Sequence, residues 1–227
     1  LAHIGIRRIV LCDDDRIEGS NINRLVGATA QDVRKRRPKT SIAERTIRAL
    51  QPVSEIDSTR ARWQQKMQSL MTCDIVFGCL DSFQARRDLE GFCRRYFIPL
   101  IDIGMNVKTS GNCPEIYGQV VVSLPGQPCL HCAGVLSEQT LSQEAQDYGD
   151  AGPKPQVVWP NGVLASTAVG FCMQLLTGWN GSREIPYRLD YQGGTGTMVI
   201  SPVCSAIVNG CVHYPESQAG DALFAKQ

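Results

Sequence analysis

Three short, largely apolar runs stand out along the chain. They cover residues 8–12, 74–80 and 98–103. Runs of this length that do not alternate with polar residues are typical of strands covered on both faces of a sheet. Asp13 follows the first run directly and Asp81 follows the second, so both are expected where a buried strand ends.

Between these runs lie two stretches with the apolar spacing of amphipathic helices, 41–50 and 82–96. Short strands that alternate with such helices predict a parallel sheet with helices on both faces. The pattern changes after Gly104, where residues 118–123 predict another strand and residues 185–214 predict late strands and turns.

The segment between those later strands has two parts. Residues 137–160 are polar, contain Gly and Pro and lack periodicity, so we expect a loop or crossing segment there. Residues 161–176 predict an apolar helix rich in small residues, which suits either a core helix or a subunit interface. From Pro215 onwards we expect a tail.

Composition narrows the class of protein. The chain has 227 residues, 43% of them hydrophobic, and a formal net charge of +1, which excludes intrinsic disorder and gives no electrostatic basis for nucleic-acid or membrane binding. No apolar run reaches the roughly 18–20 residues of a membrane span, and the start of the chain lacks the pattern of a secretion signal. Several of the ten cysteines lie in apolar runs, where Cys acts as a compact hydrophobe, so we expect a cytoplasmic protein.

Asp13 is the first candidate for ligand binding. In doubly wound sheets, ligands bind at the carboxyl ends of the strands, where an acidic residue can hold a nucleotide ribose. The glycine-rich phosphate loop that accompanies such a residue lies about 20 residues upstream, so we expect it to precede Leu1. The alternative is a solvated turn.

Further polar residues could hold phosphate and a cation. Ser20 could cap a short helix on which Asn21 and Arg24 share one face, a plausible phosphate-binding surface. Lys39 follows the basic run 34–37, which we interpret as a solvated helix edge. Asp81 could hold Mg²⁺ or, equally well, cap the helix that follows it.

A C-x-x-C pair suggests a metal site. Cys129 and Cys132 have the spacing of two tetrahedral zinc ligands, and the remaining candidates downstream are Cys204, Cys211 and His213. We expect Cys129, Cys132, Cys204 and Cys211 to bind zinc, with His213 as the substitute for Cys204. The alternative is a reduced pair without a metal.

Read in order, these motifs resemble those of the ThiF/MoeB family, the ubiquitin-activating-enzyme-like adenylyltransferases. Residues 13–24 resemble its D-x-D-x-V-x-x-S-N-L-x-R motif. Four further segments are similar to its G-x-P-K lysine, its C-x-D-N aspartate, its first zinc pair and the helix after its crossover loop, and these are residues 37–39, 79–82, 128–132 and 159–176. The resemblance covers about residues 3 to 180.

The resemblance implies a role for each matched residue. Asp13 would bind the ribose; Asn21, Arg24 and Lys39 would hold the triphosphate of ATP; and Asp81 would place Mg²⁺. Arg24, Lys39 and Asp81 would be the catalytic residues. The reaction would join the C-terminal carboxylate of a ubiquitin-like or sulfur-carrier protein with a Gly-rich tail to the α-phosphate of ATP. Zn²⁺ would be structural, and the protein would be a homodimer.

The predicted fold is accordingly a Rossmann-like, doubly wound, mostly parallel α/β sheet with late antiparallel strands and a zinc-stapled C-terminal segment. We expect an adenylation domain over residues 1–180, C-terminal strands with zinc ligands over 181–214 and a tail over 215–227. No cysteine lies between Cys132 and Cys172, which favours an adenylating type without a loop cysteine. The alternatives are a non-catalytic partner subunit and, less favoured, a nucleotide-dependent oxidoreductase.

Overall fold

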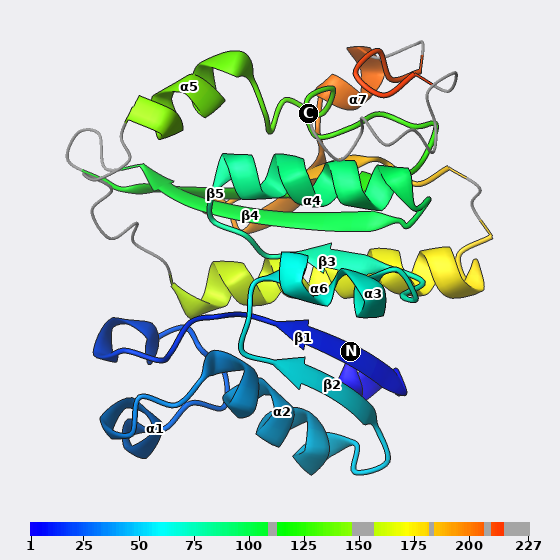
Figure 1. The fold of residues 1–227 in the computed structure, drawn as a ribbon. Helices are drawn as coiled ribbons and strands as arrows, with labels where there is room; N and C mark the ends of the chain where they lie inside the picture. The colour runs from blue at the N-terminus through cyan, green and yellow to red at the C-terminus, as the bar shows by residue number, and fades with distance from the viewer. Residues whose placement is uncertain (109–112, 147–156, 182–183, 207–209, 216–227) are drawn as a thin grey trace. The chain divides into compact units, whose positions relative to one another are not determined.

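Two sheets organise the residues that the computed structural model describes, which are 1–108, 113–146, 157–181, 184–206 and 210–215. Each sheet belongs to one of two units, Leu1–Cys73 and Asp74–Gln227 (Figure 1).

The first unit is built on a pair of parallel strands. β1 (Arg8–Cys12) pairs with β2 (Glu55–Thr59), with Arg8 opposite Glu55 and Cys12 opposite Thr59. The prediction of a strand over residues 8–12 is confirmed. The sequence did not predict β2, because its residues Glu-Ile-Asp-Ser-Thr lack an apolar run. The other elements of this unit are η1 (Ala2–Ile4), η2 (Gly19–Asn21), α1 (Ala30–Arg34), α2 (Lys39–Leu50), η3 (Trp63–Lys66) and α3 (Met67–Leu70).

The second unit contains a five-stranded sheet. Its strands follow the chain order and are β3 (Val76–Gly78), β4 (Leu100–Lys108), β5 (Glu115–Ser123), β6 (Arg188–Gln192) and β7 (Thr197–Ile200). Only β3 and β4 pair in parallel, and every later neighbour is antiparallel. The prediction of a mostly parallel sheet is therefore wrong for the described residues, and the fold is mixed α/β. The short link between β4 and β5 explains their direction, because a parallel pair needs a crossover of a dozen or more residues.

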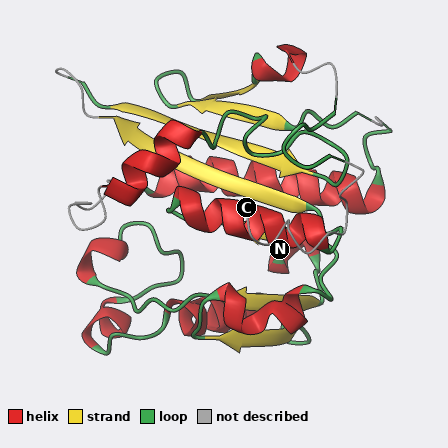
Figure 2. Ribbon diagram, turned by 45° about the horizontal axis from the view of Figure 1, so that its top comes forward, coloured by secondary structure: helices red, strands yellow, loops and turns green. Residues whose placement is uncertain are grey.

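Helices cover both faces of this sheet, as predicted. α4 (Phe83–Arg95) lies against β3 and β4, and α6 (Val158–Thr177) lies against β4 and β5 (Figures 1 and 2). Two strand glycines show that the faces are opposite: a Cβ at Gly104 would meet Arg86 of α4, whereas a Cβ at Gly118 would meet Leu164 of α6. Gly118 stands opposite Met105, so it and Gly104 face different sides. The buried run Val120–Val122 lies between the helix layers.

The segment between β5 and β6 differs from the prediction at one point. A helix, α5 (Glu138–Gln146), occupies part of the stretch expected to be a loop. Its sequence carries only one large apolar residue, Leu141, so the pattern gave no helical signal. The helix predicted over 161–176 is confirmed as α6, which begins three residues earlier. Part of the expected crossing segment and nearly all of the expected tail, residues 147–156 and 216–227, lie outside the described residues.

The last described elements of the chain belong to the second unit. β6 and β7 extend the sheet that contains β3 to β5, and the short helix α7 (Val203–Ala206) follows them. Within the described part of the chain, no helix is both long and apolar enough to cross a membrane.

Candidate functional site

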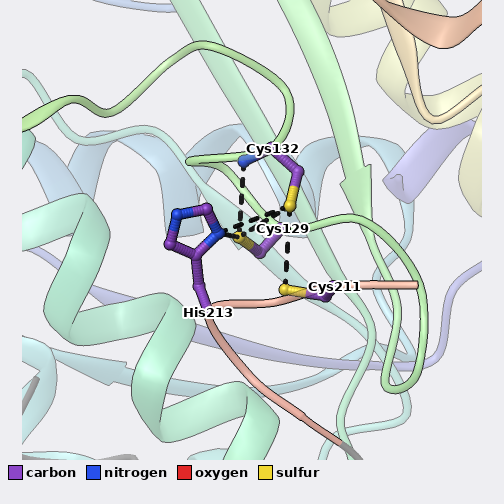
Figure 3. Close-up of side chains that lie close together, drawn as sticks. All are labelled: Cys129, Cys132, Cys211 and His213. Carbon is purple, nitrogen blue, oxygen red and sulfur yellow. Dashed lines mark hydrogen bonds between the residues drawn. The ribbon is translucent and has the colours of Figure 1, made fainter. Parts of the chain in front are cut away.

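Three cysteines and a histidine form a tight cluster in the second unit. The Sγ atoms of Cys129, Cys132 and Cys211 and a ring nitrogen of His213 all lie within 4.8 Å of one another (Figure 3). The Sγ of Cys132 is 3.6 Å from that of Cys129 and 3.8 Å from that of Cys211. The Nδ1 of His213 is 3.5 Å from the Cys129 Sγ and 3.4 Å from the Cys132 Sγ.

These separations fit a tetrahedral metal site. Zinc–sulfur bonds of about 2.3 Å and zinc–nitrogen bonds of about 2.0–2.1 Å give ligand separations of about 3.8 Å between two sulfurs and about 3.6 Å between sulfur and nitrogen. The observed distances come close to these values. The group could therefore hold a zinc ion with four protein ligands, the closed arrangement typical of structural sites.

The local backbone directs the first pair of cysteines toward each other. The N–H of Ala133 donates to the carbonyl of Cys129 at 2.7 Å, and the N–H of Cys132 lies 3.5 Å from the Cys129 Sγ. Gly134, with φ of 70°, takes the left-handed conformation that ends this turn. The turn itself is what brings positions i and i+3 together, as the C-x-x-C spacing predicted.

The second pair of ligands comes from one short segment near the C-terminus. The N–H of Tyr214 donates to the Cys211 Sγ at 3.3 Å. The Cys129 thiol and this N–H together hold the pKa of Cys211 well below its usual range. Two of the four candidate ligands, Cys211 and His213, come from residues only two positions apart in the chain.

Cys204 is the one predicted ligand that lies apart. It sits on α7, and its Sγ is 3.4 Å from the carbonyl oxygen of Arg188. His213, the expected substitute, takes the fourth position instead. The reason is local, because residues 211 and 213 reach the C-x-x-C turn from one short segment. His131, which lies between Cys129 and Cys132, stacks on the His213 ring with centroids 4.8 Å apart.

A buried ion pair on α4 supports the C-x-x-C turn. Glu90 Oε1 accepts hydrogen bonds from the N–H of Leu130 at 2.9 Å and from the hydroxyl of Ser123 at 2.5 Å. Arg94 donates to the carbonyl of Pro128 at 2.9 Å. Burial raises the pKa of Glu90 to about 7, although the nearby Arg94 lowers it. This pair was not among the residues predicted from the sequence, where the available signal was two opposite charges four residues apart on the apolar side of a helix.

Two of the predicted nucleotide residues, Asp13 and Lys39, lie at the turn after β1. The Asp13 carboxylate accepts a hydrogen bond from the N–H of Asp15 at 2.8 Å. Burial raises the pKa of Asp13. Lys39, at the start of α2, is joined to Asp15 twice: its N–H donates to the carbonyl at 3.0 Å, and its Nζ lies 2.5 Å from Oδ2. The structure thus brings Asp13 and Lys39 to one turn.

Asn21 and Arg24 also belong to the first unit. The Asn21 side-chain oxygen accepts from the N–H of Glu18 at 3.1 Å, and Glu18 is the residue that caps η2. The expectation that Ser20 caps this helix is therefore wrong, because Ser20 lies inside it. Arg24 donates to the carbonyl of Ser20 at 2.6 Å. These two predicted phosphate ligands thus make local contacts with the backbone at and just before η2.

Asp81 lies in the second unit, two residues before the start of α4. The helix is capped by Ser82, whose hydroxyl accepts from the N–H of Ala85 at 3.3 Å. The alternative interpretation of Asp81 as the cap is therefore wrong. Its carboxylate is exposed, and no hydrogen bond or ion pair to it is found among the described residues. Within the described part of the chain, the Asp81 carboxylate, three residues after the end of β3, is thus available as a cation ligand.

Comparison with known proteins assigns the family. Residues 1–207 match the ThiF family, so the chain belongs to that family. The fold agrees: a structure of Escherichia coli MccB with ATP superposes with a TM-score of 0.68 at 18% identity, over 90% of this chain and 60% of that one.

Two characterised relatives match part of this chain and are longer than it is. The chain is 30% identical over 134 residues to the SAMP-activating enzyme E1 of Haloferax volcanii, covering 58% of this chain and 46% of that protein. It is 28% identical over 137 residues to the sulfur carrier protein ThiS adenylyltransferase of Bacillus subtilis, covering 58% of this chain and 38% of that protein. The chain thus spans less than half the length of these two relatives.

Proposed function

We propose that this protein is an ATP-dependent adenylyltransferase that activates the C-terminal carboxylate of a small ubiquitin-like or sulfur-carrier protein. A carboxylate oxygen would attack the α-phosphorus of ATP, and the bond to the β-phosphate oxygen would break, so that an acyl-adenylate forms and pyrophosphate leaves. No protein nucleophile is needed for this step. Its rate would come from alignment of the reactants and from neutralisation of phosphate charge.

One observation carries the proposal: in a chain of the ThiF family, the turn after β1 is tied to the start of α2 by the contacts between Asp15 and Lys39. Asp13 would bind the ribose and Lys39 a phosphate, with Asn21 and Arg24 contributing further donors. Asp81 would hold Mg²⁺ through its free carboxylate, because hard cations take oxygen ligands beside substrate phosphates. The family's relatives that act on ThiS and SAMP proteins support the class of partner.

We further propose that Cys129, Cys132, Cys211 and His213 hold a structural zinc ion. The ion would join the turn after β5 to the C-terminal segment, and its binding free energy would become folding free energy of that segment. It would take no part in adenylation, since all four positions are filled by protein atoms.

Pyrophosphate exchange into ATP tests the enzymatic proposal. The complete protein, offered a carrier with a Gly-rich C-terminus, is expected to catalyse exchange that depends on Mg²⁺. Asp81→Ala should abolish it, and Lys39→Ala should lower it by about 100-fold, as loss of one charge-stabilising group does. Lys35→Ala is the matched control, because Lys35 is an exposed member of the basic run and should leave the rate unchanged.

Two results would contradict this assignment. Exchange at the wild-type level in Asp81→Ala would remove Asp81 from the reaction. A complete protein that binds no ATP would instead identify a non-catalytic partner subunit.

A further inference from the structure

The turn that carries Asp81 is held from both sides. Asp81 lies between Leu80, whose carbonyl is bound by a residue of α4, and Ser82, whose hydroxyl is bound by a residue of α5. The Asp81 carboxylate itself has no hydrogen-bond or ion-pair partner among the described residues. An exposed carboxylate on a fixed turn is the arrangement that a cation ligand needs, because its position is set before the cation arrives.

Arg86 holds the side toward β3. Its Nε donates to the carbonyl of Leu80 at 2.8 Å, and its two other nitrogens donate to Asp102 at 2.9 Å and to the carbonyl of Ile103 at 3.3 Å. The ion pair is buried, since the side chains of Arg86 and Asp102 are 9% and 1% exposed. A guanidinium with three acceptors in different directions cannot rotate without losing a buried hydrogen bond.

The sheet leaves space for this guanidinium. A Cβ at Gly104 would lie 2.7 Å from Arg86 Nη1, which is closer than two such atoms approach. It would lie even closer to the side-chain Nε2 of Gln119. Glycine at this position of β4 therefore lets Arg86 lie against the strand. The contact between Arg86 and β4 thus depends on Gly104 of the strand as well as on Arg86 of the helix.

Glu144 holds the other side. One carboxylate oxygen accepts from the Ser82 hydroxyl at 3.0 Å and from the N–H of Gln84 at 2.9 Å, and the other accepts from the N–H of Phe83 at 3.0 Å. These donors form the first turn of α4, where N–H groups lack partners within the helix and where the helix dipole favours a negative charge. A residue about 60 positions later in the chain thus fixes the start of α4.

We infer that Arg86 and Glu144 are positioning residues for Asp81, and that together they set the geometry of its cation site. The inference rests on the proposed function, in which Asp81 holds Mg²⁺. Neither residue is expected to touch the cation. Arg86 fixes the peptide group before Asp81 and Glu144 fixes the residue after it, so loss of either contact lets the carboxylate move. Partners of this kind commonly contribute about 10- to 100-fold to metal affinity or activity.

The dependence of pyrophosphate exchange on Mg²⁺ concentration tests the inference. Glu144→Ala should raise the Mg²⁺ concentration for half-maximal rate by about tenfold, with the rate partly recovered at saturating Mg²⁺. Glu144→Gln, which keeps an acceptor oxygen, should lie between this variant and the wild type. Arg86→Lys should shift the dependence in the same direction, because a single ammonium cannot reach three divergent acceptors.

Glu138→Gln is the matched control. Glu138 lies on the same helix and loses the same charge, but it is exposed and makes no hydrogen bond to α4 among the described residues. Its Mg²⁺ dependence should equal that of the wild type. A wild-type Mg²⁺ dependence in Glu144→Ala would overturn the inference, and so would an equal shift in Glu138→Gln, since that would report the charge of α5 and not the contact.

A second measurement separates this inference from the proposed function. Hydrogen exchange of the Phe83 and Gln84 amides should be severalfold faster in Glu144→Ala than in the wild type, whereas that of Ala85, which is bound by Ser82, should change less. Unchanged exchange at all three amides would overturn the positioning role. If the wild-type protein catalyses no pyrophosphate exchange but the amides respond as expected, the proposed function fails and the contact between Glu144 and α4 stands.

Discussion

Each residue of the cysteine–histidine cluster supplies one ligand atom, so each should be needed for metal binding. Replacing one ligand of a four-coordinate structural site leaves three, and the binding free energy that stabilises the fold falls with it. A cysteine outside the cluster, such as Cys204, should not be needed for metal binding. This difference makes the cluster testable residue by residue.

We expect Cys211→Ser and His213→Ala to lose zinc and to show a lower melting temperature, with the C-terminal segment more open to proteases. Cys204→Ser should keep about one zinc per chain, because the Cys204 thiol faces the Arg188 carbonyl and lies outside the cluster. Elemental analysis of the purified variants provides the measurement. Zinc lost from Cys204→Ser and retained by His213→Ala would restore the four-cysteine site.

The carboxylate of Asp81 differs in its contacts from the three adjacent carboxylates of the first unit. Asp13 and Asp15 already accept hydrogen bonds or pair with a cation, and Asp14 pairs with Arg62 at 3.2 Å. The three adjacent carboxylates of Asp13, Asp14 and Asp15 are thus engaged within the first unit. Asp81 differs from them because its carboxylate has no such partner among the described residues, while the residues on both sides of it are fixed.

At the scale of elements, a buried carboxylate joins α1 to α2. Asp32 accepts hydrogen bonds from the N–H and hydroxyl of Thr29 at 2.9 and 2.7 Å, and it binds Arg45 through both oxygens at 2.9 and 2.8 Å. The Arg45 hydrogen bonds, supported by those of Thr29, hold the pKa of Asp32 well below its usual range. The short helix α1 is therefore tied to α2 by the ion pair between its buried Asp32 and Arg45.

This contact predicts a pH dependence of stability. Because the pKa of Asp32 is lower in the folded than in the unfolded chain, the unfolded chain binds the proton more tightly. The stabilisation is therefore present above the unfolded pKa of about 3.9 and is lost as the pH falls through the lower folded value. The melting temperature should fall more steeply below about pH 4 in the wild type than in Asp32→Asn, which should already be less stable at pH 7. Parallel curves for the two proteins would contradict this.

Glycines decide how closely α6 approaches the sheet. A Cβ at Gly118 of β5 would lie 2.7 Å from both the carbonyl oxygen of Gly104 and the Leu164 side chain. Gly118→Ala should therefore destabilise the protein by about 1–3 kcal/mol, the usual effect of overpacking. A Cβ at Gly170 of α6 would have no neighbouring atom within 4 Å, so Gly170→Ala should stabilise the helix by about 0.5–1 kcal/mol. Urea denaturation of both variants compares them, and destabilisation by Gly170→Ala equal to that of Gly118→Ala would refute the packing argument.

For the whole molecule, the main open prediction is assembly. α6 buries one side against the sheet through Leu164, Ala168 and Phe171, while Trp159 and Leu176 near its ends remain exposed. We expect a homodimer, because a 20-residue apolar helix is more hydrophobic than a helix with one solvated face. Sedimentation at micromolar concentration should give twice the chain mass. A single monomer mass across that range would show that α6 is a core helix alone.

Much of the first level of structure followed from the sequence by itself. The strand over residues 8–12 and the helices α2, α4 and α6 depend on the spacing of nearby side chains, and that spacing is printed in the chain. The turn at Cys129 and Cys132 is equally local. The order of the motifs from Asp13 to Cys132 was also sufficient to indicate the family.

Tertiary structure decided what depends on distant partners. β2 is held by its pairing with β1, and β6 takes its direction from β5, a strand that lies more than 60 residues earlier in the chain. The choice of His213 over Cys204 depends on which segment reaches the turn. Glu144 meets α4 only because two segments about 60 residues apart fold together. Local spacing determines helices and tight turns, because their contacts lie within a few residues, whereas pairing direction, ligand sets and supporting contacts form between segments whose separation in the chain says nothing of their distance in space.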